Sequence, residues 1–124
     1  MKNHRPVNLE LSTIRFPITA IVSILHRVSG VVLLLGVLIL LAMFNMSLAS
    51  EESFNELKSL LDQVWAKLIL LGILAPLAYH FAAGIRHLIM DMGIGETLEG
   101  GKLGAKVMLG CAAVLIVLAG VLIW

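Results

Sequence analysis

Three long apolar runs constrain this chain more than any other feature of its sequence. Val28–Ala49 contains no charged side chain over 22 positions, and Leu68–Ile85 and Val107–Trp124 cover 18 positions each. About 20 apolar residues in a helix, each rising about 1.5 Å, cross the roughly 30 Å hydrocarbon core of a bilayer. Helices are favoured because backbone polar groups in lipid must be paired within the protein. The sequence therefore predicts an all-α membrane protein with three transmembrane helices.

The composition agrees with this interpretation and narrows the possible partners. Hydrophobic residues make up 60% of the 124 positions and charged residues 14%, too few to cover the surface of a small soluble domain. A net charge of +1, without a basic run, gives no sign of nucleic-acid binding. The length permits one membrane-embedded domain over 1–124. The single cysteine, Cys111, excludes an internal disulfide and is expected to be a small buried hydrophobe.

The boundaries of the helices can also be estimated. Pro17 suits the first position of a helix, so the first helix should begin near Ile18. The sequence SFNE, Ser53–Glu56, fits a capping box that starts a short surface helix. The glycine-rich stretch Gly93–Gly104 is expected to be a flexible connector. The predicted segments are an irregular polar segment over 1–16 and spans at approximately 22–49, 64–90 and 105–124.

The basic residues predict the orientation in the membrane. Seven of the nine Lys and Arg side chains lie before the first span or between the second and third, and only two lie in the first loop. By the positive-inside rule, the N-terminus is cytoplasmic and the C-terminus periplasmic. The flanking basic side chains Lys67, Arg86 and Lys106 can extend along the helices so that their charged ends reach water.

Polar residues in the second span form one stripe. His80, Gly84, His87 and Asp91 are spaced i, i+4, i+7, i+11, which places them on one helix face. An ionisable group inside a span costs about 2.5 to 3.5 kcal/mol on insertion scales, so each is a candidate functional residue. His80 is the deepest of them, and Gly84 would let a flat group approach the backbone. Asp91 could instead cap the helix or pair with a neighbouring cation.

A matching stripe begins the first span. Ser23, His26, Arg27 and Gly30 are spaced i, i+3, i+4, i+7. Antiparallel packing brings this stripe to the level of His87, with His80 a turn or two deeper. The two stripes predict a polar pocket that opens to the cytoplasm and has an imidazole at its floor.

A deep neutral imidazole is a common axial ligand of haem, and cations nearer the water suit haem propionates. His26, Arg27 and His87 could supply them. His26 is expected to be too shallow to ligate the same iron as His80, and His4 lies outside the membrane. A second axial ligand should therefore come from another chain. Ser23 and Arg27 could also hydrogen-bond a quinone head group.

At these residues the sequence resembles a known family. RPVNLELSTIRFPITAIVSILHRVSG, Arg5–Gly30, and HFAAGIRHLIMDMG, His80–Gly93, are similar to motifs of the cytochrome b membrane-anchor subunits, or C subunits, of bacterial succinate dehydrogenase (complex II). The resemblance covers nearly the whole chain, and both motifs occur in order. It implies a multi-pass protein of the bacterial inner membrane that works as an electron-transfer subunit of the enzyme.

The resemblance also implies roles for individual residues. His80 would be an axial ligand of haem b, which is shared with a second anchor, the D subunit. Ser23 and Arg27 would line the ubiquinone site, and His26, Arg27 and His87 would lie near the haem propionates. An iron–sulfur subunit and a flavoprotein that oxidises succinate would dock on the cytoplasmic face.

Three alternatives stay open from the sequence. A fumarate reductase anchor would run the reaction in reverse with a low-potential quinone. A non-redox membrane scaffold would hold soluble partners without haem or quinone. A small transport component would use His80 as a proton relay and would work without docked partners.

Overall fold

The fold is a bundle of three long antiparallel helices. The computed structural model describes residues 5–124, so Lys2 and His4 fall outside this range. Its elements are η1 (Leu11–Thr13), α1 (Ile18–Ala49), α2 (Glu51–Leu61), α3 (Val64–Asp91) and α4 (Leu98–Ile123). Helices α1, α3 and α4 are each long and apolar enough to cross a membrane. The prediction of an all-α protein with three long apolar helices is confirmed.

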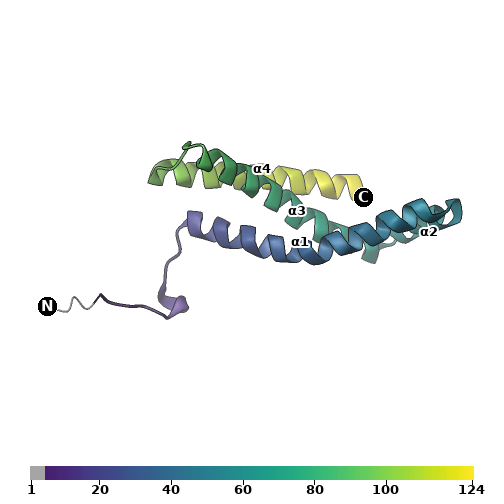
Figure 1. The fold of residues 1–124 in the computed structure, drawn as a ribbon, viewed down its shortest axis with the longest axis horizontal. Coiled ribbons are helices and arrows are strands. Elements are labelled where there is room, and N and C mark those ends of the chain that lie inside the picture. Colours follow the sequence, from purple (N-terminus) through teal and green to yellow (C-terminus); the bar gives the residue numbers. More distant parts are fainter. Residues whose placement is uncertain (1–4) are drawn as a thin grey trace.

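Figure 1 shows how these helices are arranged. The N-terminal segment and the connection between α3 and α4 lie at one end of the bundle, which we call the N-terminal end. The turn from α1 into α2 lies at the other end, and α2 folds back along the end of α1. Helix α3 packs against both α1 and α4, whereas α1 and α4 share a smaller contact. The polar residues of the first helix and of the late part of α3 are therefore placed in the same half of the bundle.

Helix α1 begins at Ile18, as the sequence predicts. Pro17 has an extended backbone and is the cap of the helix rather than its first residue. Its carbonyl accepts from the amides of Ala20 and Ile21 at 3.0 and 3.1 Å. Proline is suited to this place because its missing N–H would have no partner there. Ahead of it, the segment from residue 5 to residue 16 is irregular apart from η1 and is almost entirely exposed.

The expected capping box at Ser53–Glu56 is wrong, because the short helix starts earlier. Ser50 caps α2, and its Oγ accepts from the amide of Ser53 at 3.0 Å. The hydroxyl of Ser53 donates back to the carbonyl of Met46 at 2.7 Å and so closes the corner between α1 and α2. Serine is a suitable cap at either position, and the reversal of the chain decides that Ser50 is the cap.

The expected flexible connector over Gly93–Gly104 is also wrong for most of its length. The connection ends at Thr97, whose Oγ1 accepts from the amide of Gly100 at 3.0 Å and caps α4. Gly93 and Gly95 adopt positive φ angles of 84° and 74°, which favour glycine. A Cβ at Gly100 would lie 2.8 Å from Thr97 Oγ1, so the tight cap requires a glycine there. The remaining glycines continue as helix.

The helices pack through small side chains. The main core cluster consists of Val22, Ala82, Ala83, Ala105, Met108 and Ala112. Small residues let helix backbones approach closely, which is the usual source of association between helices in lipid. Most larger apolar side chains on the three long helices are exposed and face outward. Cys111 is among the exposed residues, so its expected burial is wrong. The outer surface of this chain is thus suited to lipid or to other apolar helices.

Candidate functional site

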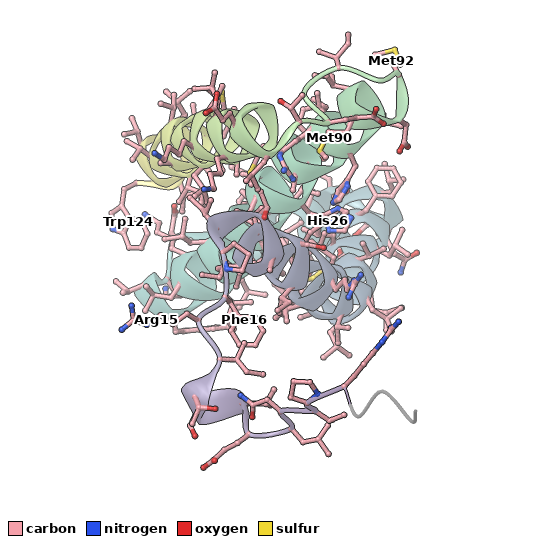
Figure 2. The ribbon with its side chains drawn as sticks, turned by 90° about the vertical axis from the view of Figure 1, so that its left-hand side faces the viewer. Arg15, Phe16, His26, Met90, Met92 and Trp124 are labelled. Carbon is pink, nitrogen blue, oxygen red and sulfur yellow. The ribbon has the colours of Figure 1, made fainter. Side chains whose placement is uncertain are left out.

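Three histidines meet between α1 and α3. His26 of α1 stacks on His80 of α3, with ring centroids 4.3 Å apart and planes inclined at 29°. The ring of His26 also lies near that of His87, further along α3, with ring centroids 4.9 Å apart and planes inclined at 36°. Figure 2 looks along the bundle from its N-terminal end and shows His26 pointing from α1 toward α3. The two predicted polar stripes therefore face each other.

This contact places His26 closer to the level of His80 than the sequence indicates, whereas the expectation that His26 does not ligate the same iron stays a prediction. His80 and His87 lie two helical turns apart on one face of α3, and the ring of His26 lies between them. The spacing along each helix was readable from the sequence, but the offset between two antiparallel helices was not. That offset depends on how small residues such as Val22 and Ala83 pack.

The Nδ1 atom of His80 is held by two oxygens of α1. It lies 2.9 Å from the hydroxyl oxygen of Ser29 and 3.2 Å from the carbonyl oxygen of His26. The hydroxyl of Ser29 also donates to that carbonyl at 2.6 Å. Within residues 5–124 the other ring nitrogen, Nε2, has no hydrogen-bond partner, and it is not enclosed by the chain. His80 is thus fixed through one nitrogen, and the other is neither hydrogen-bonded within these residues nor fully buried.

Gly30 supports the same placement of His80. A Cβ built at Gly30 would lie 3.3 Å from His80 Cε1, which is tighter than an ordinary contact. The imidazole therefore lies against the backbone of α1 in a space that a side chain would fill. Gly84 faces His26 instead, where a Cβ would lie 3.9 Å from Nε2, an ordinary van der Waals distance.

His26 has a polar atom without a partner. Its Nε2 is buried and makes no hydrogen bond within the described part of the chain. Native proteins pair nearly all such atoms with protein, water or ligand. The unpaired nitrogen faces Gly84 of α3, so a polar group arriving there would gain a hydrogen bond.

Ser23 lies on a cavity of about 330 Å³ at the N-terminal end of the bundle, lined by both polar and apolar side chains. His87 and the buried Arg86 lie on the same cavity, together with part of the α3–α4 connection. Arg27 is not among the lining residues, and its side chain is exposed. The structure brings Ser23, His26, His80 and His87 into one region but leaves Arg27 on the outside of α1. The lining residues are Thr19, Ser23, Arg86, His87, Met90, Glu96, Thr97, Leu98 and Gly101.

The expectation that Arg86 extends its charge to water is wrong. Arg86 is 9% exposed, and its Nη2 donates to the carbonyl of Gly101 at 3.3 Å. Its Nε is buried without a partner in the described residues, close to Gly104. The small residues that begin α4 leave room for this side chain. Asp91 is exposed, and within residues 5–124 it forms no ion pair with Arg86 or His87.

Ser29 is the site residue that sequence reasoning did not single out. It is buried, at 6% exposed, although it lies in an apolar run. Its position three residues after His26 and next to Gly30 puts it on the polar stripe of α1, which is the signal that could have identified it. Ser29 and His80 are 51 positions apart in the chain, so their contact depends on how α1 packs against α3.

The chemistry that the cluster can support is limited. Within residues 5–124 no group of three or more His, Cys, Asp or Glu side chains could hold a metal ion. A haem iron needs fewer protein ligands, because the porphyrin already binds it and one imidazole nitrogen can be its axial ligand. His80 Nε2 fits that requirement, since it is unpaired and open while Nδ1 is held.

Comparison with known proteins identifies the family. Residues 1–119 match the family model described as "Succinate dehydrogenase/Fumarate reductase transmembrane subunit". The chain is 42% identical over 125 residues to the succinate dehydrogenase cytochrome b556 subunit of Coxiella burnetii, with 100% of both chains covered. It is 29% identical to the corresponding subunit of Paracoccus denitrificans, over 94% of this chain and 90% of the relative.

A third relative extends the comparison. The succinate dehydrogenase cytochrome b560 subunit of Reclinomonas americana is 31% identical, over 98% of this chain and 88% of that protein. The matches run along nearly the full length of the chain and include all three long helices. This chain therefore belongs to the family of succinate dehydrogenase/fumarate reductase transmembrane subunits and is a multi-pass membrane protein.

Proposed function

We propose that this chain is the cytochrome b membrane-anchor subunit of a bacterial succinate dehydrogenase, a succinate:quinone oxidoreductase of the inner membrane. His80 contributes one axial ligand of a haem b, and Ser23 and Arg27 contribute to a ubiquinone-reduction site. The observation that carries the proposal is the state of the His80 ring. Its Nδ1 is held by Ser29 and the His26 carbonyl, while Nε2 is unpaired and open. The relatives named cytochrome b subunits support the same assignment.

The geometry of His80 suits a haem that is shared between two chains. Nε2 is accessible from outside this chain, and the second imidazole would come from the partner anchor. Bound haem supplies a one-electron carrier. His26 lies next to both His80 and His87, and its unpaired Nε2 would gain a partner from a propionate carboxylate or an ordered water.

The quinone site would lie at the N-terminal end of the bundle. Ser23 is half-buried on the cavity that His87 and Arg86 also line, and Arg27, one turn further along α1, is exposed where a partner subunit can meet it. A serine hydroxyl and a guanidinium are both donors, and a quinone carbonyl oxygen accepts hydrogen bonds from such groups. The stronger, charged hydrogen bond from Arg27 would favour the reduced quinone as negative charge builds on its oxygen. These residues bind and orient quinone, and electrons reach it from the iron–sulfur subunit.

Surfaces left open by this chain fit the other proposed partners. The segment ahead of α1 exposes apolar side chains, with Val7, Leu9 and Leu11 exposed at 76, 86 and 72%. Such a segment is suited to lie against a soluble subunit. The positive-inside rule puts this end in the cytoplasm, together with the α3–α4 connection. The flavoprotein and iron–sulfur subunits would then dock there, and a second anchor would cover part of the exposed apolar surface.

The proposal is tested by purifying the tagged chain from native membranes in mild detergent. The dithionite-reduced minus oxidised visible spectrum reports haem, and the co-purifying proteins are identified by mass spectrometry. We expect a b-type band together with flavoprotein and iron–sulfur subunits. If the partner subunits co-purify but no haem band is seen, the chain would be a scaffold or an anchor with a quinone site only. Neither haem nor partners would contradict the succinate dehydrogenase assignment and would favour a proton relay through the three histidines.

A further inference from the structure

The side chain of Ser29 links the two helices that carry the histidine cluster. It lies on α1 and is 6% exposed, and within residues 5–124 its one hydrogen bond to α3 is with the ring of His80. Its hydroxyl lies 2.6 Å from the carbonyl oxygen of His26, three residues earlier in the same helix. A carbonyl oxygen can only accept, so the single hydroxyl hydrogen of Ser29 points to His26.

The direction of this hydrogen bond determines whether Ser29 is a donor or an acceptor toward His80. With its hydrogen already given to the His26 carbonyl, Ser29 Oγ meets His80 Nδ1 at 2.9 Å as an acceptor. The other oxygen near Nδ1, the His26 carbonyl at 3.2 Å, is an acceptor too. Nδ1 must therefore carry the ring hydrogen, and in a neutral imidazole the free lone pair then belongs to Nε2.

We propose that Ser29 is a positioning residue for the haem site, which together with the His26 carbonyl sets the tautomer and orientation of His80 so that Nε2 would meet the iron as a base. This inference rests on the proposed function of His80 as a haem ligand. Groups that accept a hydrogen bond from the far nitrogen of a ligating histidine orient the ring and raise its basicity. A more basic imidazole stabilises the oxidised iron. Ser29 therefore lowers the midpoint potential of the haem as well as holding the ring.

The helix offers a matched control. Ser47 lies on the same helix, and its hydroxyl donates to the carbonyl of Phe44 at 2.6 Å, the same bond to the residue three positions earlier. No hydrogen bond joins Ser47 to another helix in the described part of the chain. Ser29→Ala and Ser47→Ala thus remove the same local interaction, and only Ser29→Ala removes the contact with His80.

The experiment measures the haem in the purified complex of wild type, Ser29→Ala, Ser29→Thr and Ser47→Ala. The readouts are the haem content per complex, the midpoint potential from a redox titration and the low-spin electron paramagnetic resonance spectrum. We expect Ser29→Ala to shift the potential to a more positive value and to change the resonance positions, or to lose haem from an assembled complex. Ser47→Ala should match wild type. Ser29→Thr, which keeps a hydroxyl, should restore the wild-type potential.

The outcomes separate this inference from the proposed function. A wild-type complex with haem, and a Ser29→Ala complex with unchanged potential and spectrum, would overturn the role of Ser29 alone. Equal shifts in Ser29→Ala and Ser47→Ala would overturn it as well, because they would show a general effect on α1. A wild-type complex without haem would overturn both. If Ser29→Ala does not accumulate, Ser29→Cys, which is similar in volume and a weaker acceptor, is judged by the same criteria.

Discussion

The imidazole rings of His26 and His80 stack across the α1–α3 interface, with centroids 4.3 Å apart. His26 also contributes its backbone carbonyl to the Nδ1 atom of His80, at 3.2 Å. One residue thus touches the proposed haem ligand with both its ring and its backbone. The position of His80 is therefore set by α1 as much as by its own helix.

Replacing His80 should remove the proposed haem from an assembled complex. His80→Leu keeps an apolar side chain of moderate size in the span but has no nitrogen to bind iron. We expect little or no b-type band in the reduced minus oxidised spectrum of the purified complex. Phe81→Leu is the control, since Phe81 is the next residue on α3 and is 60% exposed. A wild-type spectrum in His80→Leu would refute the ligand assignment.

A side chain at Gly30 should disturb the same ring. The Cβ of Gly30→Ala would lie 3.3 Å from His80 Cε1, so the imidazole must shift by a few tenths of an ångström. We expect a changed electron paramagnetic resonance spectrum or a reduced haem content. Gly72→Ala is the matched control in α3, because its Cβ would meet nothing within 4 Å. That control should be neutral or stabilise the helix by up to about 1 kcal/mol. Identical haem spectra in both variants would contradict the tight contact at Gly30.

Gly36 and Ile73 pack closely between α1 and α3, away from the histidine cluster, and a side chain at Gly36 should lower the stability of this helix pair. A Cβ at Gly36 would lie 2.9 Å from Ile73 Cγ2, a distance that forces the two helices or the side chain to move. We expect Gly36→Ala to lower the stability of the complex by about 1 to 3 kcal/mol.

A double-mutant cycle checks this explanation by thermal denaturation of the purified complex. Ile73→Ala creates space at the same place, so the double variant should lose less stability than the two single changes added together. Strict additivity would show that Gly36 and Ile73 do not act on each other.

Removing the side chains of Arg27 and Ser23, the proposed hydrogen-bond donors to quinone, should slow quinone reduction and leave succinate oxidation unchanged. We expect Arg27→Leu to lower kcat/KM for quinone by about 10- to 100-fold, which corresponds to the loss of one hydrogen bond to a charged group. Ser23→Ala should lower it by about 2- to 10-fold, because its donor is neutral. Succinate oxidation with an artificial dye as acceptor should stay at the wild-type rate. A parallel loss of both activities would indicate damage to assembly instead of to a local quinone site.

The sequence was sufficient for much of the architecture because the signals involved are local. The run from Val28 to Ala49 is too long and too apolar for anything but a membrane helix, and Pro17 marks the start of α1. The spacing of polar residues placed His80 and His87 on one face and Ser23 and His26 on another. These inferences depend on helical periodicity, which is the same in every helix.

Local patterns were misleading where two solutions fit equally well. The serines at 50 and 53 both suit a helix cap, and the turn from α1 into α2 selects Ser50. The glycines after residue 97 suggested a loop, but Thr97 caps a helix that uses Gly101 as a buried packing residue. The small residues at the start of α4 also make room for Arg86, whose side chain is therefore buried between α3 and α4 instead of extending to water.

By itself, the sequence determined that this protein is a three-span helical membrane subunit and which faces of its helices are polar, because hydrophobicity and periodicity act within each segment. Only the tertiary structure decided that His26 stacks on His80, that Ser29 forms a hydrogen bond with the His80 ring and that Arg27 stays outside the cluster. These relations depend on the offset and rotation of α1 against α3. That offset is set by the packing of small side chains over the whole interface, so no single stretch of sequence encodes it.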